Sequence, residues 1–459
     1  RALGELPSVL TERVRDAEGG WMAKLKLITF GCQANEADSE KIAGVLAQEG
    51  FELTETAEEA DLILINTCSI REKAEQKVYS LLGTFQKLKI QNPRMKIGLC
   101  GCLAQREGAR LKDRFPYLDL LAGPGAMIYR IPEMLRGAPA PPVLPRPQEP
   151  LPLYIRSPRP RRESPFKAWV SIMEGCNYLC TFCVVPYTRG PERSRPPEDI
   201  LAEVEELLKQ GYKELTLLGQ TVNAYGKNLK PRTRFSDLLR AIDALVGRNM
   251  RVRFTSSHPR DLTPDLIEVM ARLRSVCEHL HLPVQAGSDR VLARMRRLYT
   301  RQQYLEKVAM LRQTVPDIAL STDLIVGFPG ESEEDFQETL RLLCQVRYDS
   351  IFAFKYSVRP LTPATTYPDQ VSGEAKTERI HAVLQLQDEI ALEKNRERVG
   401  KIEEVLIEDG PNPKMHSVAT GRTRRNQLVH FSQESLVPGD TVSAVITEGY
   451  SHYLKGKIP

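Results

Sequence analysis

The sequence lacks a run of apolar residues approaching the ~18 that a membrane-spanning helix needs, and no secretory signal is visible in it. An excess of one charge is also missing. The 64 basic and 59 acidic side chains give a net charge of +5, which permits an anionic partner without requiring one. We therefore expect no membrane partner. The nine cysteines favour a reducing, cytoplasmic compartment, where thiols bind metals rather than form disulfides.

The length of 459 residues is too great for one ordinary hydrophobic core, so two or three domains are expected. The hydrophobic share of 41% and the charged share of 27% are ordinary for a globular protein. Changes in pattern along the chain divide it into five parts. These are an extension over 1–23, which opens on Arg1 rather than Met, an N-terminal domain over 24–137, a proline-rich linker over 138–165, a central domain over 166–394 and a small C-terminal domain over 395–459.

Three cysteines in a CxxxCxxC pattern, Cys176, Cys180 and Cys183, follow an apolar run that predicts a strand over 168–173. Three thiolates at this spacing can hold three corners of an iron–sulfur cubane and leave the fourth iron open. A structural zinc site needs four ligands, and no fourth cysteine or histidine lies nearby. The pattern therefore favours an open iron–sulfur cluster over a zinc knuckle or a group of reactive thiols.

The N-terminal domain alternates strand and helix patterns, which is typical of a doubly wound parallel sheet. We expect strands over 25–30, 61–66 and 96–100, and helices over 39–48 and 71–89.

Cys32, Cys68 and Cys102 each lie one to three residues beyond the end of one of these strands. Because ligands bind at the carboxyl ends of parallel strands, the fold is expected to bring the three thiols together around a second cluster. The alternative is three buried structural thiols. Gly31 and Gly101 would let the backbone approach a bulky inorganic ligand. Cys100 lies within a predicted strand and is interpreted as a core residue.

The central domain repeats strand and helix six times, which predicts a partial (β/α)6 barrel with its active site at the carboxyl ends of the strands. Cys277 and Cys344 stand alone in apolar helical patterns and are predicted to be core thiols. The expected strands are 168–173, 214–218, 251–255, 279–282, 319–326 and 351–356, and the expected helices are 198–210, 236–246, 264–273, 301–313, 331–346 and 373–398.

The C-terminal segment consists of short β patterns separated by Gly and Pro, which predicts a small antiparallel β-barrel. Its run Gly421-Arg-Thr-Arg-Arg-Asn426 is strongly basic, and small β-barrels with basic loops often bind nucleic-acid phosphates. A solvated charge run is the alternative. The end of the linker is also basic, and there an RNA contact and a solvated spacer are equally compatible with the sequence. Its basic residues are Arg156, Arg159, Arg161 and Arg162.

The CxxxCxxC triplet resembles the CxxxCxΦC signature of the radical S-adenosylmethionine (SAM) superfamily, with Phe182 at the Φ position. Over residues 24–459 the chain resembles the methylthiotransferase family within that superfamily, and specifically its MiaB-type tRNA branch. The motifs that carry the resemblance are Gly31-Cys-Gln-Ala-Asn35, Asn66-Thr-Cys-Ser-Ile-Arg-Glu-Lys-Ala74, Gly101-Cys-Leu-Ala-Gln105, the run from Gly175 to Gly190, Leu218-Gly-Gln-Thr-Val-Asn223 and Gly421–Asn426. The chain departs from the family pattern at Ala34, Ala286 and Leu361, and none of these changes removes a ligand.

The resemblance implies two [4Fe–4S] clusters and SAM as cofactors, with SAM bound to the open iron and cleaved reductively to a 5′-deoxyadenosyl radical. It implies methylthiolation of C2 of an isopentenyl-adenosine beside the tRNA anticodon, with two SAM consumed. In this interpretation Cys176, Cys180 and Cys183 hold the SAM cluster, and Cys32, Cys68 and Cys102 hold the sulfur-donating one. The SAM pocket is assigned to Phe182, Gln220, Ser257, Gln285, Asp323 and Tyr356, and RNA contacts to Arg189, Asn223, Arg422, Arg424 and Arg425.

The expected partners are the anticodon stem-loop of tRNA and an electron donor such as a flavodoxin or ferredoxin, and the expected state is a monomer. Three alternatives remain. A sister enzyme acting on threonylcarbamoyl-adenosine is disfavoured by Asn66–Lys73, and a ribosomal-protein methylthiotransferase by the basic run Gly421–Asn426. An RNA-binding scaffold with purely structural clusters is disfavoured by the open-iron triplet.

Overall fold

The computed structural model of the chain describes residues 22–68, 72–137, 160–410, 419–432 and 436–459. The chain forms two compact units. Unit 1 consists of Arg1–Glu163 and Val184–Pro191, and unit 2 of Ser164–Cys183 and Glu192–Pro459. Among the described residues no helix has both the length and the apolar character needed to cross a membrane. Arg156 and Arg159 of the predicted basic linker lie outside the described residues.

Unit 1 contains a five-stranded sheet in the order β2-β1-β3-β4-β5, with every strand parallel to its neighbours. The predicted doubly wound sheet is confirmed. The sequence missed β2 and β5, which are three residues each and too short for a periodic pattern to appear. The strands are β1 (Ala23–Phe30), β2 (Phe51–Leu53), β3 (Leu62–Thr67), β4 (Lys96–Gly101) and β5 (Leu120–Ala122).

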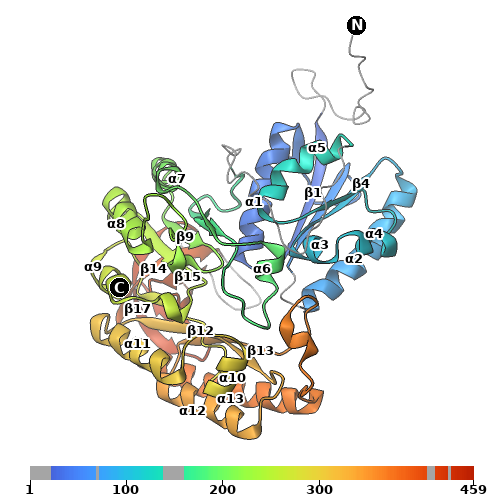
Figure 1. Ribbon diagram of the computed structural model, residues 1–459. Coiled ribbons are helices and arrows are strands. Elements are labelled where there is room, and N and C mark those ends of the chain that lie inside the picture. The colour runs from blue at the N-terminus through green and yellow to red at the C-terminus, as the bar shows by residue number, and fades with distance from the viewer. Residues whose placement is uncertain (1–21, 69–71, 138–159, 411–418, 433–435) are drawn as a thin grey trace. The chain divides into compact units, whose positions relative to one another are not determined.

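Helices cover both faces of this sheet (Figure 1), and a cluster of buried apolar side chains lies between the helices and the sheet on each face. On one face α1 (Gln33–Gln48) and α5 (Ile131–Leu135) pack on strand residues such as Leu62 and Leu64. On the other face α2 (Glu72–Gln91), α3 (Cys102–Glu107) and α4 (Ala109–Arg114) pack on Ile63 and Ile65. Successive residues of β3 thus point into opposite layers, and all six are buried, as expected for a central parallel strand.

The barrel of unit 2 is built from two three-stranded parallel sheets, in the orders β10-β9-β6 and β11-β12-β13. A single bridge between Val252 and Val276 connects them. The six predicted strands are all present, and the partial barrel is confirmed. They are β6 (Lys167–Ser171), β9 (Glu214–Leu218), β10 (Arg251–Phe254), β11 (His279–His281), β12 (Ala319–Val326) and β13 (Ser350–Lys355).

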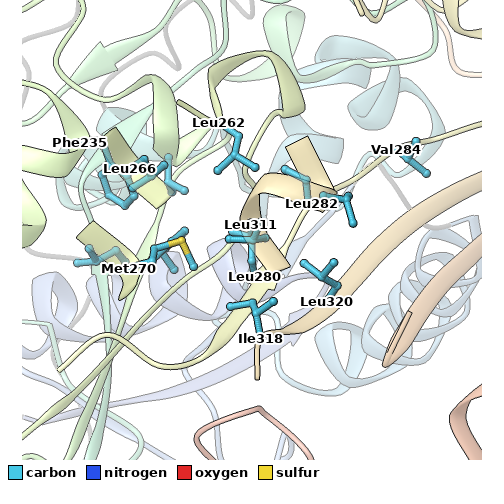
Figure 2. Close-up of a cluster of buried hydrophobic side chains, with 14 of the residues drawn as sticks. Phe235, Leu262, Leu266, Met270, Leu280, Leu282, Val284, Leu311, Ile318 and Leu320 are labelled. Atoms are coloured by element: carbon cyan, nitrogen blue, oxygen red, sulfur yellow. The ribbon is translucent and has the colours of Figure 1, made fainter. Parts of the chain in front are cut away.

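Amphipathic helices surround these strands, and the apolar side chains between them form one large core. Figure 2 shows part of this core, including Phe235, Leu266 and Leu311 from three helices and Leu280 and Leu320 from β11 and β12. Each of these five side chains is almost fully buried. The helices are α7 (Pro197–Lys209), α8 (Phe235–Val246), α9 (Pro264–Arg272), α10 (Asp289–Arg294), α11 (Arg301–Thr314), α12 (Glu333–Val346) and α13 (Gly373–Arg396).

The C-terminal segment closes into a five-stranded barrel in the order β14-β15-β16-β18-β17. The predicted small barrel is confirmed, although one of its pairs, β16 with β18, is parallel. Its strands are β14 (Ile402–Asp409), β15 (Ala419–Thr423), β16 (Leu428–Phe431), β17 (Thr441–Gly449) and β18 (Leu454–Lys457).

The basic run Gly421–Asn426 docks this small barrel onto the amino-terminal ends of the large barrel's strands. Arg424 donates to Glu278, just before β11, at 2.8 Å, and Arg425 donates to Asp349, just before β13, at 3.1 Å. In return Arg253 of β10 donates to the carbonyls of Thr423 and Arg424 at 2.8 and 2.9 Å. The run therefore joins the two barrels.

The cysteines outside the two triplets differ from one another in their surroundings. Cys100 is fully buried in the core beneath α1, and burial raises its pKa to about 12. Cys277 is also buried, but it lies between α9 and β11 rather than in a helix. The prediction was wrong for Cys344, which lies in α12 but is exposed. A single cysteine does not disclose which face of an amphipathic helix it occupies.

We expect Gly101→Ala to destabilise the protein and Gly83→Ala to stabilise it. Gly101 has φ +89°, and a Cβ there would lie 2.5 Å from the Thr67 carbonyl oxygen, so Gly101→Ala should lower the opening free energy of the β3–β4 pair by about 1–3 kcal/mol. Gly83 lies exposed within α2 with open space around it, so Gly83→Ala should stabilise by about 0.5–1 kcal/mol. Hydrogen exchange of the full chain measures both, and equal effects would contradict this account.

Candidate active site: two cysteine triplets

The three N-terminal cysteines lie at one edge of the unit 1 sheet. Cys32 follows β1 by two residues, and Cys68 and Cys102 directly follow β3 and β4. These three strands are adjacent in the sheet, and the Cys68 amide donates to the Phe30 carbonyl at the end of β1 at 3.0 Å. The fold thus brings together three cysteines that are far apart in the sequence, at the edge where parallel sheets bind ligands.

The glycines beside these cysteines have no room for a side chain. A Cβ on Gly31, which has φ +151°, would lie 2.8 Å from the Cβ of Cys68. At Gly101 the same atom would meet Asn66 Oδ1 at 2.5 Å. The backbone therefore passes closely beneath the cysteines, as the sequence predicted from the two glycines.

Buried polar side chains support the loop that carries Cys32. Asn66 donates to the Asn35 carbonyl at 2.8 Å and to Ser39 Oγ at 3.0 Å, and the Cys32 thiol lies 3.4 Å from Asn35 Oδ1. A hydrogen bond between the side chains of Cys32 and Cys68 lowers the pKa of Cys32 to about 6, although burial acts in the opposite direction. The thiolate is the form that binds metals, so this environment suits a ligand.

Arg189 approaches the same cysteines although it follows the other triplet in the sequence. Its segment, Val184–Pro191, belongs to unit 1, and its guanidinium donates to Asp38 of α1 at 2.7 Å. Burial raises the pKa of Cys102, and the positive charge of Arg189 opposes that shift. Arg189 was predicted to contact RNA, but its side chain is 7% exposed and lies beside the cysteines. No local signal in the sequence indicates this placement.

The second triplet lies on the loop after β7 (Met173–Glu174). Cys180 is buried, while Cys176 and Cys183 are partly exposed. The Cys176 sulfur lies 3.3 Å from Thr221 Oγ1, and the Gly175 amide donates to Gln220 Oε1 at 2.6 Å. Gln220, predicted to line the SAM pocket, thus fixes the start of the cysteine loop from the end of β9.

Sequence reasoning missed Arg297, which is buried and donates to the Cys180 sulfur at 3.3 Å. It also missed His258, whose ring stacks on Tyr178 with centroids 4.1 Å apart. Burial, with nearby cations, lowers the pKa of His258 to about 2, so this ring is neutral. Its position directly after Ser257 at the end of β10 was the available signal.

The residues predicted for the SAM pocket lie at or near the carboxyl ends of the barrel strands. Ser257 Oγ, after β10, and the Tyr356 hydroxyl, after β13, are buried without a hydrogen-bond partner among the described residues. Asp323 lies within β12, half-buried, 3.5 Å from His281. Gln285 has φ +75° and pairs with β12, while Phe182 packs on the large core. Buried polar atoms that lack partners fit a polar ligand such as SAM.

The residues predicted to bind RNA are not equivalent. Asn223 is buried, and its amide exchanges hydrogen bonds of 2.9 and 2.8 Å with the backbone of His258, which fixes that loop. Arg424 and Arg425 dock the two barrels, with side chains 21% and 8% exposed. Arg422 is the most exposed of the three arginines, at 38%, and faces Glu408 at 3.3 Å. The structure therefore assigns intramolecular contacts to all of these residues except part of Arg422.

The donor sets suit iron–sulfur clusters. No group of three His, Cys, Asp or Glu side chains within the described ranges is arranged to hold one metal ion. Both triplets also consist of thiols alone, the donors that such clusters prefer.

Three family models match the chain in succession. Residues 24–123 match a family described as "Uncharacterized protein family UPF0004", residues 170–343 match the radical SAM superfamily, and residues 396–458 match the TRAM domain.

Solved structures share the fold at low identity. The radical S-adenosylmethionine methyltransferase TsrM from Kitasatospora setae superposes with a TM-score of 0.56 at 14% identity, covering 75% of this chain and 77% of that chain. The cobalamin-dependent S-adenosylmethionine radical enzyme OxsB gives a TM-score of 0.53 at 13% identity, covering 80% and 56%.

Curated relatives match nearly the whole chain. A protein of Desulforamulus reducens is 48% identical over 95% of this chain and 96% of its own length, and one of Carboxydothermus hydrogenoformans is 48% identical over 94% and 98%. Both are named tRNA-2-methylthio-N(6)-dimethylallyladenosine synthase. At this identity and coverage, with both cysteine triplets in place, the chain belongs to the tRNA-2-methylthio-N(6)-dimethylallyladenosine synthase family of radical SAM enzymes.

Proposed function

We propose that the protein methylthiolates C2 of isopentenyl-adenosine next to the anticodon of tRNA, using two [4Fe–4S] clusters and SAM. The observation that carries this proposal is the presence of two cysteine triplets in two separate folds, one at the carboxyl ends of β1, β3 and β4 and one on the loop after β7. The named relatives support the same substrate rather than threonylcarbamoyl-adenosine or a ribosomal protein.

Cys176, Cys180 and Cys183 would hold the SAM cluster, and Cys32, Cys68 and Cys102 the sulfur-donating cluster. When bound, these groups supply the radical and the sulfur that acid–base side chains cannot provide at an unreactive aromatic C–H bond. The chain's own residues bind and orient the reactants. Ser257 and Tyr356 offer unpaired polar atoms to SAM, and Gln220 fixes the Gly175 backbone beside the cysteine loop.

The TRAM domain, over the predicted limits 395–459, would bind the RNA. Arg422 supplies a partly exposed cation. Tyr450 and Tyr453 stack with centroids 4.6 Å apart, and Lys455 lies 5.2 Å from the Tyr450 ring. Half-exposed aromatic rings beside a cation suit an unstacked base and its phosphate. The target adenosine must leave its stack to reach the chemistry, so such contacts would hold the loop open.

The proposal also extends to the electron donor, the compartment, the oligomeric state and the domain limits. Each radical cleavage of SAM needs one electron at low potential, which a flavodoxin or ferredoxin would deliver. We propose a cytoplasmic monomer, with an N-terminal cluster domain over 24–137, a linker over 138–165 and a barrel over 166–394. Within that linker, the amide of Arg161 and the guanidinium of Arg162 donate to Glu40 of unit 1 at 2.9 and 2.8 Å.

The substrate is tested with tRNA that carries one of three bases beside the anticodon: isopentenyl-adenosine, threonylcarbamoyl-adenosine or unmodified adenosine. Reconstituted protein is incubated anaerobically with each tRNA, SAM and reductant, and nucleosides are analysed by mass spectrometry. We expect a methylthio product only from the first. Product only from the second would move the protein to the sister activity. SAM cleavage without any nucleoside product would point to a protein substrate.

The assignment of the sulfur-donating cluster is tested by comparing Cys102, which follows β4, with Cys100, which lies within β4. Cys102→Ala should keep SAM cleavage and abolish methylthiolation, because it removes a ligand of the sulfur-donating cluster only. Cys100→Ala changes a buried core thiol, so both reactions should continue and bound iron should be unchanged. Iron content and nucleoside analysis provide the readouts. A Cys102→Ala protein that still methylthiolates tRNA would refute the assignment.

The role of the basic run is tested by salt dependence. Arg422→Ala should weaken tRNA binding and reduce the slope of log K against log salt by roughly one, because one phosphate contact is lost. Arg425→Ala removes docking bonds to Asp317 and Asp349, so it should lower the melting temperature and leave the slope unchanged. If the two variants exchanged these effects, the docking interpretation would be wrong.

A further inference from the structure

A buried cation lies against the cysteine loop of unit 2. Arg297 is 5% exposed, and its guanidinium donates to the Cys180 sulfur at 3.3 Å, to the Tyr299 hydroxyl at 3.0 Å and to the Pro283 carbonyl at 3.0 Å. All of these acceptors are formally neutral when the thiol is protonated. Within the described ranges, no carboxylate lies within ion-pair distance of Arg297.

An unpaired buried guanidinium is costly, so a fold that holds one usually provides an anion nearby. Other buried arginines of this chain follow that rule: Arg189 pairs with Asp38 at 2.7 Å, Arg253 with Glu214 at 2.8 Å, and Arg379 with Glu331 at 2.8 Å. Among the buried arginines that the structure describes, Arg297 is the exception, and the group that it approaches is a predicted cluster ligand.

The backbone holds Arg297 rigidly in this place. The residues on either side, Arg296 and Leu298, have φ angles of +55° and +60°. Residues other than glycine rarely adopt such positive values. The same segment anchors the cysteine loop, because Thr181 donates its amide to the Met295 carbonyl at 3.1 Å and its hydroxyl to the Arg294 carbonyl at 2.9 Å. Strain that persists at a defined point indicates a functional constraint.

We propose that Arg297 is the counter-cation of the cluster held by Cys176, Cys180 and Cys183, and that it favours the reduced state of that cluster. A [4Fe–4S] core of charge 2+ held by three thiolates carries one net negative charge. Reduction adds one electron from an external low-potential donor, so the core becomes 1+ and the assembly carries two negative charges. The fixed positive charge stabilises the second state more than the first, and a hydrogen bond to the sulfur acts in the same direction.

Arg297 is thus a positioning residue that acts through Cys180, not a group that touches the substrate. The proposal rests on the assignment of the three cysteines to a cluster, which is part of the proposed function. The two can fail separately. A wild-type protein that takes up no cluster at this site refutes the cluster assignment, whereas a loaded cluster that is indifferent to Arg297 refutes only the counter-cation.

The test is a reductive titration of the SAM cluster followed by electron paramagnetic resonance. It uses the full-length chain with Cys32, Cys68 and Cys102 replaced by Ala, so that only one cluster is present. Arg297→Gln should reduce the equilibrium constant for reduction about tenfold, equivalent to a midpoint potential about 59 mV more negative. Arg297→Lys, which keeps the charge, should lose less. Arg294→Gln is the matched control, because Arg294 lies on the same segment but pairs with Asp369 at 2.7 Å, and it should not change the potential.

An unchanged potential in Arg297→Gln, or an equal loss in Arg297→Lys, would overturn the proposal. Thermal unfolding provides a second test in case a variant takes up iron poorly. Without the cluster, Arg297→Met should unfold no earlier than the parent protein, because it removes an uncompensated buried charge. With the cluster it should gain less stability than the parent does. Equal losses of melting temperature with and without the cluster would show a merely structural role.

Discussion

Parallel strand pairing places the carboxyl ends of neighbouring strands at one edge of a sheet, and this gathers the three cysteines of unit 1 and the predicted SAM-pocket residues of unit 2. In unit 1 the order β2-β1-β3-β4-β5 makes β1, β3 and β4 neighbours, although β2 intervenes in the sequence. Cys32, Cys68 and Cys102 meet for that reason alone. In unit 2 the same geometry brings Ser257 and Tyr356 to the end of the barrel that carries the cysteine loop. The chemistry follows from where the strands stop.

Charge balance is the second constraint, and the two sites meet it differently. Thiolates and the clusters they hold are anionic, so each site gains from a nearby cation. Beside Cys102 the cation is Arg189, whose charge is already shared with Asp38 at 2.7 Å. Beside Cys180 it is Arg297, which has neutral partners only among the described residues. A shared charge attracts an added electron less than an unshared one, so under the proposed counter-cation role Arg297 would favour reduction of a nearby cluster more than Arg189 would.

Periodicity and strand ends made much of this predictable from the sequence. The barrel strands were found within a few residues, and the cysteines were correctly placed at strand ends, because both depend on local patterns. The strands β2 and β5 were missed for their shortness, and the face of α12 that carries Cys344 was misjudged. The positions of Arg189 and Arg297 depend on contacts between residues far apart in the chain, about which local patterns carry no information.

The basic run Gly421–Asn426 shows the same limit from the other side. Its composition indicates a phosphate site, yet Arg424 and Arg425 meet Glu278 and Asp349 at the amino-terminal ends of the barrel strands. These contacts stabilise the amino-terminal end of the barrel and leave the opposite, carboxyl end for ligands. This is the usual arrangement in barrels of this kind. Both guanidinium groups are thus engaged in contacts within the chain. Under the proposed function, RNA recognition by the small barrel would rely on outward side chains such as Arg422 and the stacked pair Tyr450 and Tyr453.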